Sequence, residues 1–221
     1  YSFSINLVLE EKKKQQMKKE QLESELKMLR TQINPHFLFN TLNNLFSSAR
    51  RNSDFETAQG ISYLSDMMRF MLYEGNEDMI SLKKEVDYID NYIQLQKLRF
   101  EATDEIDINF KKDGEYDNLK VAPLLLIPFV ENAFKYGINL RKTSFIDISL
   151  FAYEKQMLFK IKNSKHSVKK PSNDGGIGIE NVEKRLRLIY GEDCFKLKID
   201  DDGELFHVFL HIKFQNSRKD M

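Results

Sequence analysis

The chain has 221 residues, and its 34 basic and 34 acidic side chains leave a formal net charge of zero. This balance gives no general attraction to nucleic acid, so we expect no direct nucleic-acid binding. No apolar run is long enough to predict a membrane span. The single cysteine, Cys194, excludes an internal disulfide and fits a reducing compartment. Because the chain starts at Tyr1 rather than Met, we expect it to be a fragment.

The first part of the chain predicts a charged helix. Residues 10–33 contain no Gly or Pro, and four apolar residues are spaced four, three and four apart: Leu22, Leu26, Leu29 and Ile33. Such a heptad seam favours a parallel helical dimer, although a solvated helix with one apolar stripe also explains it. At the next joint, either Asn34 caps a new helix that starts at Pro35, or Pro35 kinks one continuous helix.

Two amphipathic helices are predicted next. The first runs to about Arg51 and the second from Phe55 to about Tyr73, with a turn at residues 52–54. Consecutive amphipathic helices with a short turn form a helical hairpin. Because a hairpin of this size lacks a core of its own, we expect two copies to pair in a four-helix dimer.

The rest of the chain predicts a sheet with helices on one face. Residues 81–85 indicate a capped helix start, and this helix continues to about Phe100. Further helices are predicted at residues 124–136 and 178–190, and a polar loop at residues 164–176 precedes the second of them. Strands are predicted at residues 106–110, 146–151, 158–162, 195–199 and 205–214.

One histidine stands out because its surroundings are apolar and amide residues. His36 lies in the run from Gln32 to Asn44, with no cysteine or acidic ligand nearby. A neutral imidazole nitrogen can attack phosphorus near neutral pH. Phe37 follows directly, so no adjacent carboxylate orients the ring, whereas Asn40 shares the helix face one turn later. A packed helix histidine would otherwise be the better explanation, and the motifs further along reverse that preference.

A second pattern is typical of a nucleotide site. Gly176 and Gly178 precede a helix, where glycines let backbone amides approach phosphate. Asn132 offers a neutral oxygen suited to a Mg²⁺ ion that already carries phosphates. Lys135 lies three residues on, on the same helical face, and can meet phosphate charge. Each feature alone also fits a loop or a solvated helix face, but together they indicate phosphoryl transfer from ATP to the histidine.

These motifs carry a family resemblance that covers about residues 25–215. Residues 123–137 resemble the N box, and residues 176–181 the second glycine box, of the ATP-binding domain shared by sensor histidine kinases and gyrase. The His36 segment resembles the phosphoacceptor segment of LytS-like histidine kinases. The resemblance implies an α+β chain with three parts: a signalling or linker helix (1–33), a helical hairpin for dimerisation and phosphoacceptance (34–76), and a Bergerat-type α/β sandwich that binds ATP (77–221).

The resemblance also implies roles for single residues. Asn132 would ligate Mg²⁺, and Lys135 and Tyr136 would line the ATP. Gly176 and Gly178 would frame the phosphates under a lid at residues 164–175. Three lysines of this lid, Lys165, Lys169 and Lys170, fit a solvated loop better than a binding role. Asn163 stands where the family has an Asp that accepts from the adenine amino group, so we expect weaker adenine binding.

The implied activity is autophosphorylation of His36 by ATP, with Asn40 positioning water or the aspartate of a partner. The implied assembly is a homodimer that forms the cytoplasmic portion of a membrane-anchored sensor and passes the phosphoryl group to a DNA-binding response regulator. One alternative is an ATP-hydrolysing clamp, but Pro128 occupies the place of its catalytic Glu. The other is a non-catalytic scaffold of the same fold, which the altered residue at Asn163 leaves open.

Overall fold

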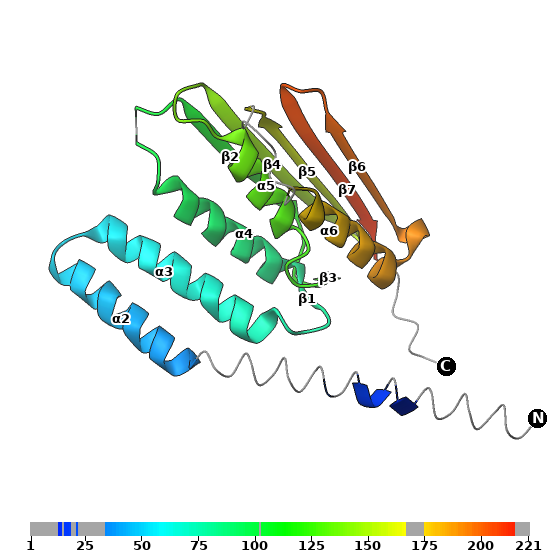
Figure 1. The fold of residues 1–221 in the computed structure, drawn as a ribbon, viewed down its shortest axis with the longest axis horizontal. Coiled ribbons are helices and arrows are strands. Elements are labelled where there is room, and N and C mark those ends of the chain that lie inside the picture. The colour runs from blue at the N-terminus through cyan, green and yellow to red at the C-terminus, as the bar shows by residue number, and fades with distance from the viewer. Residues whose placement is uncertain are drawn as a thin grey trace, which may run out of the picture. The chain divides into compact units, whose positions relative to one another are not determined.

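The structure is a computed structural model that describes residues 13, 14, 16–18, 21, 34–101, 103–166 and 175–214. The predicted seam of leucines, most of the predicted lid, and with it Lys169 and Lys170, lie outside the described residues. Among the described residues, no helix is long and apolar enough to cross a membrane. The chain divides into two compact units, Tyr1–Ile61 and Ser62–Met221, coloured from blue to cyan and from cyan to red (Figure 1).

The first unit contains helix α2 (Pro35–Arg51) and the first turns of α3 (Phe55–Arg69). The Asn34 side chain accepts a hydrogen bond from the Phe37 amide at 3.2 Å. Pro35 stands in the first turn, where its missing N–H costs nothing. Of the two alternatives left open for this joint, the structure supports the first, in which Asn34 caps a helix that begins at Pro35. Asp54 caps α3 in the same way, because its carboxylate accepts from the Thr57 amide at 3.0 Å.

In the second unit, five strands form one sheet in the order β2-β4-β5-β7-β6. The β2–β4 pair is parallel and the other three pairs are antiparallel. These strands are β2 (Ile106–Gly114), β4 (Ser144–Tyr153), β5 (Gln156–Ser164), β6 (Phe195–Asp201) and β7 (Leu205–Lys213). The five predicted strands are thus confirmed, although four of them are longer than expected. A separate two-residue ladder, β1 (Ile80–Ser81) with β3 (Lys120–Val121), was not predicted.

Three helices cover one face of the sheet: α4 (Leu82–Lys97), α5 (Ile127–Gly137) and α6 (Gly175–Tyr190) (Figure 1). The core lies between these layers, where Phe129 of α5 and Phe159 of β5 are both fully buried, with ring centroids 6.4 Å apart. The opposite face carries exposed charges such as Lys160 and Lys162. The predicted α+β arrangement, with helices on one side of the sheet, is confirmed.

Two helix starts differ from the prediction. Helix α5 begins at Ile127 rather than at Leu124, because Leu124 has a φ of 55°, a left-handed conformation that no helix continues. Helix α6 already includes Gly175, so the glycine-rich segment forms its first turn instead of a loop. Glycine is unfavourable in helix interiors, but in the first turn the amides need no intrahelical partner.

Candidate functional site

The end of strand β5 is fastened to the end of helix α5. The Ser164 hydroxyl donates to the Gly137 carbonyl at 2.8 Å, and the His166 amide donates to the Tyr136 carbonyl at 3.1 Å. The His166 ring forms a hydrogen bond with the Ser144 hydroxyl at 2.9 Å. Burial, and to a smaller extent the nearby charge of Lys142, lowers the pKa of His166. These bonds bring the predicted adenine-binding strand beside the helix that carries the predicted phosphate-binding residues.

Asn163 is fully buried at this junction. Its amide nitrogen donates to the Ser164 carbonyl at 2.7 Å, which fixes the orientation of the side chain. Its carbonyl oxygen, by contrast, has no hydrogen-bond partner among the residues that the structure describes. Buried polar atoms are normally paired, so an unpartnered acceptor is a candidate contact for a ligand donor.

Gly137 allows this arrangement, and sequence reasoning did not single it out. A Cβ atom on Gly137 would lie 2.8 Å from the Asn163 amide nitrogen and 3.1 Å from the Ser164 carbonyl oxygen. The last turn of α5 can approach β5 this closely only without a side chain at that position. Gly137 therefore sets the place of Asn163.

Three predicted residues follow one another along α5. Asn132 and Tyr136 are half-buried and Lys135 is exposed. The Lys135 ammonium lies 5.0 Å from the centroid of the Tyr136 ring, a cation–π contact. The Asn132 side chain retains a neutral oxygen suited to Mg²⁺, which in nucleotide sites takes few protein ligands. These residues fit a Mg²⁺–triphosphate group.

Gly176 and Gly178 lie in the first turn of α6. Among the described residues, a Cβ atom on Gly178 would meet nothing within 4 Å, so no described contact accounts for glycine there. A glycine at a helix start suits the approach of an anion. The Lys165 ammonium bonds the Asp201 carboxylate at 2.5 Å.

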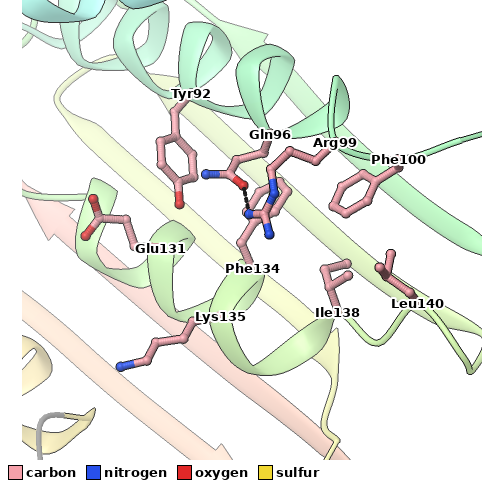
Figure 2. Close-up of a pocket in the computed structure, with 9 residues that line it drawn as sticks. All are labelled: Tyr92, Gln96, Arg99, Phe100, Glu131, Phe134, Lys135, Ile138 and Leu140. Carbon is pink, nitrogen blue, oxygen red and sulfur yellow. Dashed lines mark hydrogen bonds between the residues drawn. The ribbon is translucent and has the colours of Figure 1, made fainter.

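A hollow of 420 Å³ lies between α4 and α5, on the side of α5 that carries Glu131 and Phe134. In Figure 2 the Tyr92 hydroxyl points toward Glu131, while Arg99 bonds Gln96 at 2.6 Å. Burial, and then the charge of Glu131, raises the pKa of Tyr92 to about 12. Of the predicted nucleotide-site residues, Lys135 lines this hollow, whereas Asn132, Asn163 and Gly178 do not.

His36 and Asn40 meet on the exposed face of α2. The Asn40 amide nitrogen lies 3.2 Å from Nδ1 and 3.3 Å from Nε2 of the His36 ring. It can therefore donate to whichever ring nitrogen is unprotonated. Phe37, in place of a carboxylate, is 70% exposed. Asn40 thus lies against the His36 ring, on the helix face that the spacing predicted the two residues to share.

The comparisons agree with these motifs. Residues 24–103 match the family model for histidine kinases. The chain is 33% identical over 172 residues to the sensor histidine kinase BtsS of Escherichia coli, covering 77% of this chain and 30% of that protein. It is 30% identical over 213 residues to YpdA of the same organism, covering 91% and 37%. It is also 30% identical over 224 residues to the sensor protein LytS of Oceanobacillus iheyensis, covering 94% and 37%.

Among solved structures, the catalytic domain of the histidine kinase ThkA matches 61% of this chain and 94% of its own, with 15% identity and a TM-score of 0.44. The chain belongs to the sensor histidine kinase family, and its relatives include the LytS proteins. It spans about a third of the length of the curated relatives it matches.

Proposed function

We propose that the chain is the kinase core of a sensor histidine kinase, which transfers the γ-phosphoryl group of ATP to His36. The observation that carries this proposal is the buried, unpartnered oxygen of Asn163. An acceptor fixed in that orientation suits the exocyclic amino group of adenine and disfavours the oxygen that guanine carries there. Family membership supplies the reaction class.

In phosphoryl transfer the protein mainly positions the reacting groups and neutralises the charge of the phosphates. Asn132 would hold Mg²⁺, which supplies neutralisation of the phosphate oxygens. Lys135 and the amides at Gly176 and Gly178 would meet the remaining charge. One ring nitrogen of His36 bonds the γ-phosphorus as the bond to the ADP oxygen breaks. The proton on the other ring nitrogen then leaves to water, because no carboxylate stands next to the histidine.

The assembly follows from the same proposal. The hairpin would pair with that of a second copy, and the full-length protein would be a membrane-anchored sensor with this portion in the cytoplasm. The phosphoryl group would pass to an aspartate of a DNA-binding response regulator. Exposed apolar side chains on α2, such as Phe37 and Leu45 (52% exposed), support pairing of the helices, since isolated apolar faces of this kind need a partner.

Hydrolysis as the main task is less well supported. A hydrolase of this fold needs a carboxylate where Pro128 stands, in the first turn of α5. A silent scaffold is favoured by one observation alone, the uncharged Asn163. Labelled ATP separates these functions: we expect label from the γ- but not the α-phosphate on the native chain, and none on the His36→Gln variant. ATP binding without label would favour the scaffold, and release of free phosphate without label would favour the hydrolase.

A further inference from the structure

Glu85 is the one charged side chain that is fully buried among the described residues. It lies on α4, four residues after Ser81, whose hydroxyl caps this helix by accepting from the Lys84 amide at 3.4 Å. An acidic residue in a first helical turn is ordinarily solvated and complements the helix dipole. A buried carboxylate is instead costly unless hydrogen bonds replace its hydration. The contacts of Glu85 therefore need an explanation.

Both carboxylate oxygens of Glu85 accept backbone hydrogen bonds from the segment that leads into α5. Oε2 accepts from the Leu124 amide and Oε1 from the Leu126 amide, each at 2.8 Å. We call residues 122–126 the α5 entry loop. Leu126, the residue before the helix, makes no side-chain cap of its own. Glu85 thus caps α5 from a neighbouring helix, and it does so where Leu124 is held in a left-handed conformation.

Helix α6 also bonds the α5 entry loop, through backbone groups of the loop that Glu85 does not contact. The Arg185 guanidinium donates to the Pro123 carbonyl at 2.8 Å and to the Leu124 carbonyl at 3.3 Å. The Tyr190 hydroxyl accepts from the Ala122 amide at 3.1 Å. The loop is therefore bonded through its amides to α4 and α6, and through its carbonyls to α6.

This loop joins the two helices that carry the proposed phosphate-binding groups. Helix α5 presents Asn132 six residues and Lys135 nine residues after the loop, and α6 presents Gly176 and Gly178 in its first turn. A Mg²⁺–triphosphate group must contact both helices, and small errors in such positions weaken binding strongly. Contacts that fix one helix against the other therefore bear on nucleotide affinity.

We propose that Glu85 is a positioning residue for the nucleotide: through the α5 entry loop, and together with Arg185, it sets α5 relative to α6 and so sets the affinity for Mg²⁺–ATP. This inference rests on the proposed function, because it assumes that the two helices bind one nucleotide. Glu85 itself touches no nucleotide. A residue that only stabilised the core would change the free energy of unfolding and leave the affinity of the folded protein unchanged.

The test uses Glu85→Gln, which keeps the side-chain shape but retains one acceptor for two amides. Arg185→Lys is the second variant, because it keeps the positive charge but loses the planar guanidinium whose two nitrogens donate to two carbonyls. Glu183→Gln is the matched control, since Glu183 lies partly exposed on α6 and pairs with Arg187 at 2.7 Å. Dissociation constants for a fluorescent ATP analogue with Mg²⁺ are measured at a temperature where circular dichroism finds each protein fully folded.

We expect the dissociation constant to rise roughly five- to tenfold in Glu85→Gln and in Arg185→Lys, and to stay within about twofold in Glu183→Gln. The double variant should rise by less than the product of the single effects, because both residues act on one loop. Unchanged affinity in folded Glu85→Gln, or in Arg185→Lys if the first variant does not fold, would overturn the inference. No binding by the native chain would instead overturn the proposed function.

Discussion

Replacing Asn163 with Leu separates the stability of the fold from its function. The variant keeps a branched side chain of similar shape but removes the unpartnered oxygen and the amide nitrogen that bonds Ser164. An unpaired buried acceptor costs roughly 1–3 kcal/mol, and a neutral hydrogen bond contributes about 0.5–1.5 kcal/mol. Because the two changes nearly cancel, the free energy of unfolding without nucleotide should stay within about 1 kcal/mol of the native value or rise.

Nucleotide binding should respond differently. Without the Asn163 oxygen, the adenine amino group is left without a hydrogen-bond partner in a buried site, which costs roughly 1–3 kcal/mol of binding free energy. ATP binding should therefore weaken about ten- to a hundredfold, measured by calorimetry, and the preference for ATP over GTP should shrink. Asn109→Leu serves as control, since Asn109 is an exposed residue of β2 that bonds Asp147 at 3.2 Å. A loss of stability above about 3 kcal/mol with unchanged ATP affinity would refute the reasoning, because the amide would then be structural.

Three further predictions concern the same elements. Gly137→Ala should lower the free energy of unfolding by about 1–3 kcal/mol and weaken ATP binding, because the new Cβ displaces Asn163; denaturant titration and calorimetry check both. Asn34→Ala should destabilise α2 by about 1 kcal/mol, seen as a lower thermal midpoint, and an unchanged midpoint would argue against the cap. Burial raises the pKa of Glu85 to about 7 against the opposing effect of the entry-loop amides. Since this folded-state pKa lies above its ordinary value, the stability that Glu85 contributes is present below pH 4.5 and is lost as pH rises through 7, on the order of 3 kcal/mol in total. Urea unfolding should give a lower free energy of unfolding at pH 8.5 than at pH 5.5 in the native chain, and this contribution of Glu85 should be missing in Glu85→Gln.

Local signals in the sequence were enough to predict the longer helices and strands. Asn34-Pro35 contains a cap and a first-turn proline within two residues, so the start of α2 was predictable. In the longer strands, apolar and polar residues alternate over five or more positions. By contrast, β1 and β3 have two residues each, too few to show a period, and they form only because the chain brings Ile80 to Val121.

The site details that sequence reasoning missed depend on contacts between distant residues. Glu85 has the sequence position of an ordinary first-turn glutamate, and only the entry loop, 39 residues further on for Leu124, shows why it is buried. The place of Asn163 was predicted, but the orientation of its amide depends on Ser164 and on the close approach of Gly137. Gly175 and Gly176 were expected in the loop before α6, because propensity alone disfavours glycine in a helix.

The central claim is that His36, among the four histidines of the chain, receives the phosphoryl group. The most direct measurement is mass spectrometry at neutral pH of peptides from the native chain after incubation with Mg²⁺ and ATP, alongside His36→Gln and His211→Gln. We expect an acid-labile phosphoryl group on the peptide that contains His36, retained in His211→Gln and absent from His36→Gln. A phosphoryl group on another residue, or one that persists in His36→Gln, would contradict it.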